Sequence, residues 1–150
     1  MSKIIHESVL LACDSQRAFE MFTVNELVES WLALIADVEA KAGGKYELFW
    51  RPDDRENDST IGCTITAVEP CEFISFNWKG PEQFSHFMNV ADPLTHVTVL
   101  FTEVANGSAP RIRVHLIHSG WRDAADWEEA RLWFEKSWRS ALLGLASSIR

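Results

Sequence analysis

The stretch that decides the fold is DWEEARLWFEKSWRSALLGLASSI, residues 126–149. Its apolar and small side chains recur at three- and four-residue steps, and at about 100° per residue they occupy an arc of about 120°. Asp126 and Glu129 have the spacing of an N-terminal cap pair. The pattern predicts a long amphipathic helix. Its core-facing stripe consists of Trp127, Ala130, Phe134, Trp138, Ala141, Leu142, Leu145 and Ile149.

Upstream of this helix, apolar and polar residues alternate in a way that is typical of strands with one buried face. The Gly43-Gly44 and Asn106-Gly107 pairs interrupt the alternation where tight turns between antiparallel strands are expected. The predicted strands cover residues 3–13, 35–40, 45–51, 60–69, 73–79, 94–104 and 110–118.

Two short helices are expected after the first strand. Asp14 or Ser15 can cap a helix over residues 15–22, and Thr23 and Glu26 fit a capping box for a second helix that ends near residue 32. Residues 80–93 show no clear hydrophobic period and are interpreted as a long loop that contains unusually many apolar side chains. Three of its residues suit a lid over an opening, a loop anchor or a dimer contact: Phe84, Phe87 and Met88.

The resulting order is a strand, two short helices, six strands and one long helix. Hairpin-length connections between the six strands require an antiparallel sheet. The final helix, about 35 Å long at about 1.5 Å per residue, is long enough to cover the apolar face of a curved sheet. We therefore expect an α+β fold in which residues 1–150 form one domain and the sheet wraps around the C-terminal helix.

Composition limits the classes of function. The chain of 150 residues has 14 Lys and Arg against 22 Asp and Glu, a formal net charge of −8, and 47% hydrophobic residues with seven tryptophans. The negative charge disfavours nucleic acids and anionic membranes as partners. No segment has the roughly 18 to 20 apolar residues of a membrane span, and the N-terminus lacks the long apolar run of a signal peptide. We expect a cytoplasmic protein.

Metal and catalytic signatures are weak. His115 and His118 are three residues apart, so on a strand they point to opposite faces. Cys13, Cys63 and Cys71 form no close pair, and residues 53–58 lack the pattern of a calcium-binding loop. No nucleophile elbow or phosphate-binding glycine loop occurs. The sequence predicts no metal, no cofactor and no catalytic residue.

Several short motifs follow one another in a characteristic order: Asp14-Ser15-Gln16-Arg17-Ala18-Phe19, Gly43-Gly44-Lys45-Tyr46, Phe76-Asn77-Trp78, Val97-Thr98-Val99 and Ser137-Trp138. Through them nearly the whole chain resembles the activator-of-heat-shock-chaperone-ATPase homologue family, within the START and birch-pollen-allergen-like helix-grip superfamily. The resemblance implies a helix-grip fold whose pocket, between sheet and helix, often takes lipids, hydrophobic metabolites or hormones. The eukaryotic co-chaperones of this family have an additional domain for which 150 residues leave no room.

The expected pocket is apolar and aromatic, which suits a lipid-like or polyketide-like molecule bound without covalent chemistry. His118 shares the inward register and is expected as a polar contact or as a buried imidazole with satisfied hydrogen bonds. The predicted ligand-binding residues are Ile61, Cys63, Ile65, Phe76, Trp78, Val99, Phe101, Leu116, His118, Trp127, Phe134, Trp138 and Leu142.

Two alternatives remain open. The large side chains can fill the space as a close-packed core, and the chain is then a protein-interaction, co-chaperone-like or homodimeric module. Trp133, on the flank of the helix stripe, marks either the pocket mouth or such a contact. The other alternative is a cyclase- or hydrolase-type enzyme that uses polar cavity residues. The chain is expected to be a monomer or a homodimer.

Overall fold

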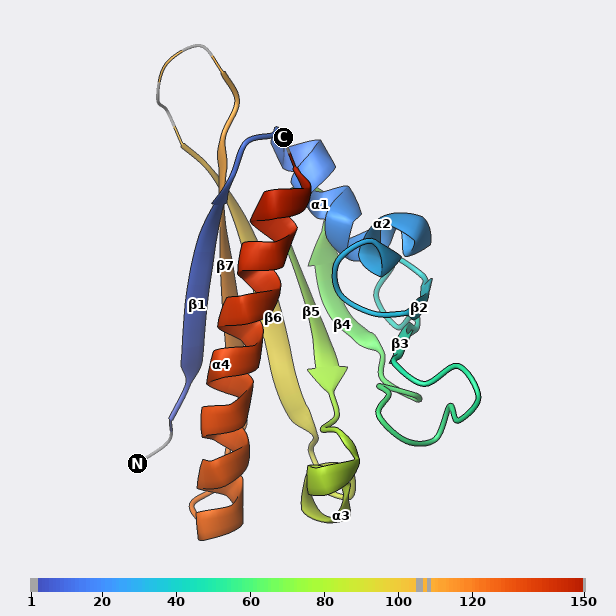
Figure 1. Cartoon of the computed structure of the whole chain (residues 1–150). Helices are drawn as coiled ribbons and strands as arrows, with labels where there is room; N and C mark the ends of the chain where they lie inside the picture. Colours follow the sequence, from blue (N-terminus) through green and yellow to red (C-terminus); the bar gives the residue numbers. More distant parts are fainter. Residues whose placement is uncertain (1–2, 105–106, 108, 150) are drawn as a thin grey trace.

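Strand pairing builds one curved sheet and one separate hairpin (Figure 1). The computed structural model of the chain describes residues 3–104, 107 and 109–149. Its elements are β1 (Ile5–Leu11), α1 (Ser15–Thr23), α2 (Asn25–Glu29), β2 (Ile35–Val38), β3 (Tyr46–Phe49), β4 (Ile65–Glu69), β5 (Phe73–Trp78), η1 (Glu82–Phe84), α3 (Ser85–Met88), β6 (Thr95–Glu103), β7 (Ile112–Ser119) and α4 (Ala125–Ser148).

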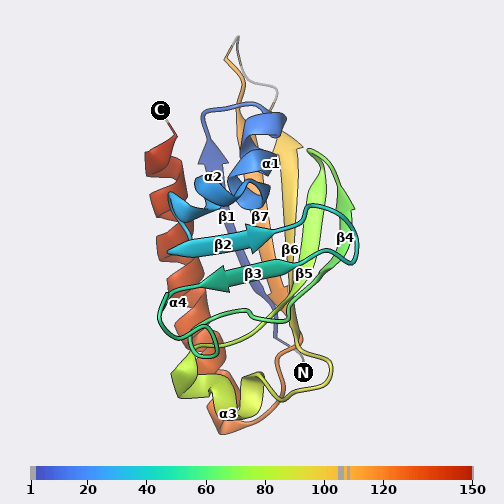
Figure 2. The ribbon, with the colours of Figure 1, turned by 90° about the vertical axis from the view of Figure 1, so that its right-hand side faces the viewer.

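The main sheet has five strands in the order β1-β7-β6-β5-β4, and all neighbours are antiparallel. The long helix α4 lies across this sheet (Figure 1). The β2–β3 hairpin crosses the side of the molecule between α4 and β4 (Figure 2). Backbone bonding continues from β3 toward β4 through a bridge between Lys45 and Thr64. The predicted α+β helix-grip architecture is confirmed.

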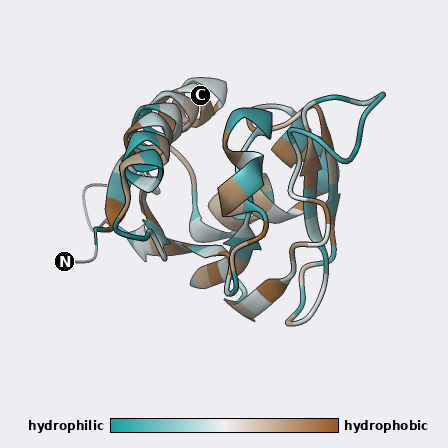
Figure 3. Ribbon diagram, turned by 90° about the horizontal axis from the view of Figure 1, so that it is seen from below, coloured by the Kyte–Doolittle hydropathy of each residue, from teal (hydrophilic) through white to brown (hydrophobic). Residues whose placement is uncertain are grey.

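The alternation read from the sequence matches the burial of the central strands. Along β7, every second residue from Ile112 to His118 is buried. The inward residues of β5 and β6 are buried in the same way: Ile74, Phe76, Trp78, Val97, Val99 and Phe101. Seen from below, α4 mixes hydrophilic and hydrophobic residues along its length, as an amphipathic helix does (Figure 3).

Of the three predicted side-chain caps, one is confirmed, because Asp14 Oδ1 accepts the backbone N–H of Arg17 at 2.8 Å at the start of α1. The other two are wrong. The Thr23 hydroxyl donates back to the carbonyl of Phe19 at 2.9 Å, so α2 begins after Val24 without a side-chain cap. The helix α4 is preceded by Ala124, which provides no side-chain cap, and the Asp126 carboxylate accepts the adjacent backbone N–H of Trp127. A hydroxyl or carboxylate near a helix start has competing local partners, and spacing alone does not choose among them.

Strand β4 and the segment of residues 80–93 also differ from the prediction. Ile61 precedes β4, which starts at Ile65, and a register shift between Ile65 and Ala67 breaks the expected alternation. Residues 80–93 contain η1 and α3 rather than a structureless loop. The predicted turn at Gly43-Gly44 is confirmed by the β2–β3 hairpin. The Asn106-Gly107 turn falls partly outside the described residues.

Candidate ligand-binding site

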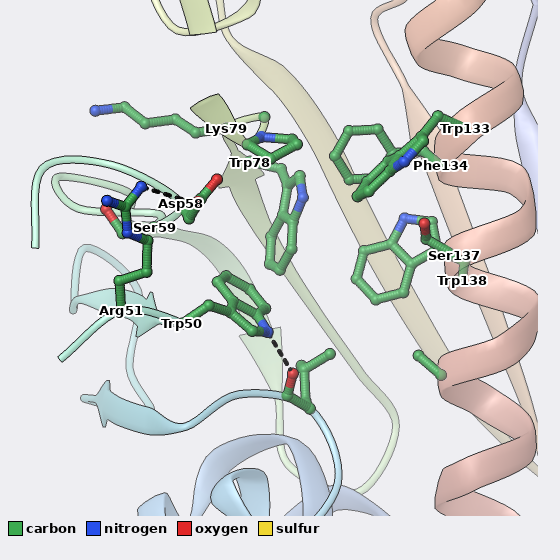
Figure 4. Close-up of a pocket in the computed structure, with 14 residues that line it drawn as sticks. Trp50, Arg51, Asp58, Ser59, Trp78, Lys79, Trp133, Phe134, Ser137 and Trp138 are labelled. Atoms are coloured by element: carbon green, nitrogen blue, oxygen red, sulfur yellow. Dashed lines mark hydrogen bonds and ion pairs between the residues drawn. The ribbon is translucent and has the colours of Figure 1, made fainter. Parts of the chain in front are cut away.

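A cavity of about 440 Å³ lies between α4 and the strands that face it (Figure 4). Five aromatic side chains line it. Trp50 follows β3 and Trp78 ends β5, while Trp133, Phe134 and Trp138 come from α4. Its volume falls within the range of about 300–1,000 Å³ that is typical of small-molecule sites.

Each wall follows from a local sequence rule. Phe134 and Trp138 are four residues apart on the core stripe of α4, so both rings point to the same side of the helix. Trp78 occupies the last inward position of β5. Trp50 is held by a hydrogen bond from its indole N–H to the carbonyl of Leu32 at 2.9 Å. Helix spacing thus sets the α4 wall, while strand register and a hydrogen bond to a backbone carbonyl set the strand-side wall.

The rings meet at steep angles. Trp50 and Trp78 have ring centroids 6.1 Å apart and planes at 75°. Trp78 and Trp138 are 5.1 Å apart at 50°, and Trp133 and Phe134 are 4.9 Å apart at 82°. These are edge-to-face and tilted contacts, which aromatic pairs prefer over direct stacking. The rings form walls in several orientations around one space.

A polar network lies directly behind two of these walls. The indole N–H of Trp138 donates to His118 Nδ1 at 3.1 Å. Since an indole nitrogen only donates, Nδ1 is unprotonated and Nε2 carries the proton, which it donates to Thr95 Oγ1 at 2.9 Å. The Thr95 hydroxyl donates in turn to the carbonyl of Trp78 at 3.2 Å. The network links the α4 wall to the β5 wall.

His118 is a neutral structural group in this network. Its side chain is fully buried, and burial lowers the pKa of His118 to about 3, with a smaller contribution from His96. Both ring nitrogens are engaged by Trp138 and Thr95. Of the two roles predicted for His118, the geometry corresponds to the satisfied buried imidazole, and the ring is not among the cavity-lining groups.

The polar rim is on the strand side of the cavity. Arg51 Nη1 lies 2.9 Å from Glu82 Oε1 and 3.3 Å from Asp58 Oδ2, and Arg51 Nη2 lies 3.6 Å from Asp54 Oδ2. Asp58 Oδ1 also accepts the backbone N–H of Glu82 at 2.8 Å. Three carboxylates thus surround one guanidinium. The Lys79 side chain extends away from the indole rings (Figure 4).

Three of the thirteen predicted ligand-binding residues line this cavity: Trp78, Phe134 and Trp138. Ile61 is half-buried outside it. The other nine are buried elsewhere in the core: Cys63, Ile65, Phe76, Val99, Phe101, Leu116, His118, Trp127 and Leu142.

Side chains from distant elements fill the space over those core residues. Tyr46 of β3 stacks on Phe76 with ring centroids 3.8 Å apart, and Phe22 of α1 packs on Phe101 at 5.6 Å. Apart from Trp78, the sequence did not predict the residues that line the strand side of the cavity. These residues are Leu32, Trp50, Arg51, Asp58, Ser59, Lys79, Gly80 and Pro81. The surplus of tryptophan in the sequence was the signal for Trp50.

The segment of residues 80–93 anchors itself on α4. Phe84 packs on Trp133 with ring centroids 5.7 Å apart, and Phe87 packs on Trp127 at 5.1 Å. Met88 is fully buried. Phe84, Phe87 and Met88 therefore support the aromatic wall from outside, and none of them lines the cavity.

Burial raises the pKa of Cys63 to about 12, which keeps its thiol protonated. In residues 3–104, 107 and 109–149, no three His, Cys, Asp or Glu side chains are grouped so as to hold a metal ion. Within the same residues, no helix has the length and apolar character to cross a membrane.

Comparison with known proteins identifies relatives by fold. Protein BH1534 from Bacillus halodurans is 19% identical, with a TM-score of 0.73 over 100% of both chains. The Aha1 dimer from Colwellia psychrerythraea is 14% identical, with a TM-score of 0.73 over 98% of this chain and 96% of that one. The HSP90 activator PFC0360w from Plasmodium falciparum is 18% identical, with a TM-score of 0.65 over 93% and 90%.

At these identities the solved structures establish the fold alone. The comparison with curated protein sequences gives no match. The family profile described as "Activator of Hsp90 ATPase homolog 1-like protein" matches residues 12–149, nearly the whole chain. The resemblance noted from the motifs is confirmed, and the chain belongs to this family of Activator of Hsp90 ATPase homolog 1-like proteins.

Proposed function

We propose that the protein binds a small hydrophobic or aromatic molecule in the cavity between α4 and the facing strands. The observation that carries this proposal is the cavity of about 440 Å³ walled by Trp50, Trp78, Trp133, Phe134 and Trp138. Aromatic walls with a few polar groups at the rim are the usual composition of small-molecule sites. Burial of apolar ligand surface against these rings supplies the binding energy.

The chemistry of the lining favours binding without covalent change. Ser59 and Ser137 are the hydroxyl side chains of the lining, which includes neither histidine nor cysteine. His118 has both ring nitrogens engaged and a pKa lowered to about 3, so it is a poor general base. An enzyme that used cavity polar groups would have five to draw on, Arg51, Asp58, Ser59, Lys79 and Ser137. Arg51 and Asp58 are paired with each other.

Native mass spectrometry of gently purified protein, followed by a thermal-shift screen with fatty acids, flavonoids and aromatic metabolites, tests the proposal. A ligand of the native state raises the melting temperature in a saturable way. Trp138→Ala should abolish the shift. Trp127→Ala is the matched control, because Trp127 is a buried tryptophan of the same helix outside the cavity. A shift that survives Trp138→Ala would place binding elsewhere.

A second candidate function is a homodimeric or co-chaperone-like interaction module. Large apolar side chains are exposed on α4, with Leu132 at 46%, Trp133 at 40% and Leu143 at 62%. The related Colwellia protein is described as a dimer, and the Plasmodium protein as an HSP90 activator. Sedimentation velocity over a hundredfold range of concentration distinguishes a monomer from a dimer, and Leu143→Lys should reverse any association through this face.

We also propose that residues 1–150 act as one domain in the cytoplasm. The formal net charge of −8 supports a protein that avoids nucleic acid and anionic lipid surfaces. Cell fractionation of the tagged protein at native expression is the direct test. Recovery in the membrane fraction would contradict the proposal.

A further inference from the structure

We propose that the ligand of this cavity carries a carbonyl-type oxygen, in a ketone or a carboxylate, that accepts a hydrogen bond from the indole N–H of Trp78. This inference rests on the proposed function and names the polar group that the hydrophobic ligand carries. Its basis is an imbalance in the cavity lining, where side-chain donors are free and the side-chain acceptors are engaged.

The first step concerns the nitrogen of Trp78. This side chain is only 3% exposed, yet its indole N–H makes no hydrogen bond with any residue that the structure describes. Across the same residues, every fully buried side-chain nitrogen or oxygen has a hydrogen-bond partner. The Trp78 nitrogen is therefore open to a space, and the space that Trp78 borders is the cavity. Figure 4 shows the nitrogen edge of the ring turned toward α4.

The neighbouring tryptophans show that this free donor is a particular feature of Trp78. The indole N–H of Trp50 donates to the carbonyl of Leu32 at 2.9 Å, and that of Trp138 donates to His118 at 3.1 Å. An indole nitrogen can donate but cannot accept. A donor left unpaired in a largely apolar site is unfavourable, so a ligand that brings an acceptor gains affinity from this position.

The second step concerns the other free groups of the lining. A serine inside a helix commonly returns its hydroxyl to a carbonyl one turn earlier, as Ser148 does to Leu145 at 2.7 Å. The Ser137 hydroxyl makes no such bond to a described residue, and the Lys79 ammonium forms no ion pair with one. Both can donate to a ligand. The lining therefore offers free donors on its helix side and on its strand side.

The third step concerns the acceptors. Asp58 Oδ2 accepts from Arg51 Nη1 at 3.3 Å, and Asp58 Oδ1 accepts the backbone N–H of Glu82 at 2.8 Å. The Ser59 hydroxyl donates to the carbonyl of Arg55 at 2.7 Å. A ligand amine would bring further donors to a lining whose side-chain acceptors are already engaged, whereas a ligand oxygen would meet free donors. Hydrogen bonding thus favours an acceptor on the ligand.

Isothermal titration calorimetry with four probes that share one aromatic body tests the inference. The probes are 2-acetylnaphthalene, 2-naphthoate, 2-isopropylnaphthalene and 2-naphthylmethylammonium. We expect the ketone or the carboxylate to bind more tightly than the ammonium, and their relative affinities distinguish a neutral carbonyl ligand from an anionic one. Because a hydrocarbon leaves water more readily than a ketone does, the hydrocarbon is compared through its response to a variant and not through its absolute affinity.

The variant is Trp78→Phe, which keeps an aromatic ring in the wall and removes the N–H. Affinity for the ketone and the carboxylate should fall about fivefold, while affinity for the hydrocarbon changes less than about twofold. Trp127→Phe is the matched control, because it makes the same truncation at a buried tryptophan outside the cavity lining. It should leave all probe affinities unchanged.

A measurement on the wild-type protein does not depend on the stability of the variant. Proton–nitrogen correlation spectra give each tryptophan its own indole N–H resonance, and selective assignment identifies that of Trp78. The ketone or the carboxylate should move this proton downfield relative to the hydrocarbon probe, since the two share the same naphthalene ring. An identical position with all probes would contradict the hydrogen bond.

The outcomes are separable. If Trp78→Phe weakens the ketone, carboxylate and hydrocarbon probes equally, or if the ammonium binds most tightly, the inference is wrong and the proposed function stands. The same holds if a ligand from the thermal-shift screen binds without a carbonyl or carboxylate oxygen. If none of the four probes binds and no ligand in the screen does, both the inference and the proposed function fail.

Discussion

The aromatic side chains of this protein fall into two groups, those packed in the core and those that line the cavity. Phe76 is 1% exposed and stacks on Tyr46 with ring centroids 3.8 Å apart, so it is ordinary core. Trp50 is 37% exposed and has one side toward the cavity. The residue type is similar, but the surroundings assign one ring to packing and the other to the proposed binding site.

This division predicts different costs for the same kind of truncation. Phe76→Ala should reduce the free energy of unfolding by about 3–5 kcal/mol, because it removes a fully packed ring and leaves a void. Trp50→Ala should cost only about 1–2 kcal/mol, since part of the ring already faces solvent and the cavity. Urea denaturation of both variants measures the difference. Equal losses would mean that Trp50 is core.

His118 gives a second prediction at the residue scale. His118→Phe removes the hydrogen-bond partner of two buried groups. The Trp138 indole N–H loses its acceptor, and the Thr95 hydroxyl loses its bond to the imidazole. Each unpaired group costs about 1–3 kcal/mol, so we expect a loss of about 2–6 kcal/mol for the two. His118→Asn retains an acceptor for Trp138 and should lose less. A smaller loss for the phenylalanine variant would show that the network contributes little to stability.

Among the elements, the short helix α1 depends on partners from other segments. Its carbonyl groups at Met21 and Phe22 lie in the last turn, where helix carbonyls lack partners within the helix. The Trp31 indole N–H donates to Met21 O at 2.8 Å, and the Tyr46 hydroxyl donates to Phe22 O at 2.8 Å. Aromatic side chains thus complete the hydrogen bonding of this helix end and attach it to β3.

Tyr46→Phe should therefore destabilise the protein by about 1–2 kcal/mol while keeping the ring that stacks on Phe76. The buried carbonyl of Phe22 would lose the hydroxyl that donates to it. Hydrogen exchange should show faster opening of α1 in this variant, with β6 and β7 unchanged. If the opening rates of α1 stayed the same, the Tyr46 hydroxyl would not be a constraint on the helix.

For the whole molecule, three histidines whose pKa values are lowered make stability depend on pH. Burial lowers the pKa of His118 to about 3, and burial also lowers the pKa values of His96 and His115. In the unfolded chain a histidine binds its proton near pH 6.5. Below that pH the unfolded state therefore binds more protons than the folded state. The contribution of these histidines to the free energy of unfolding is fully present above pH 6.5, and it decreases as the pH falls toward their pKa values in the folded state.

The expected result is a free energy of unfolding that declines between pH 6.5 and 4.5. One histidine contributes at most about 1.4 kcal/mol per pH unit to this slope. His118→Asn removes one such group, so its stability should fall less steeply than that of the wild type over the same range. Chemical denaturation at half-unit pH steps provides the comparison. Parallel slopes would show that His118 does not control this pH dependence.

Periodicity in the sequence determined the order of the elements, the inward registers of the central strands and the face of α4 that meets the sheet. These features are local. Inward-facing residues recur every second position in a strand and every third or fourth position in a helix, and the backbone geometry of the single element sets this repeat. Trp78, Phe134 and Trp138 could accordingly be placed at the interface between sheet and helix before the structure was known.

The tertiary structure decided where that interface is filled and where it is open. Phe22 and Tyr46, from elements distant in sequence, occupy the space over Phe101 and Phe76. Trp50 and the residues after it instead border a gap opposite α4. Whether a buried face encloses a cavity depends on the summed volumes of side chains that meet from several segments, and the periodicity of one segment carries no information about that sum.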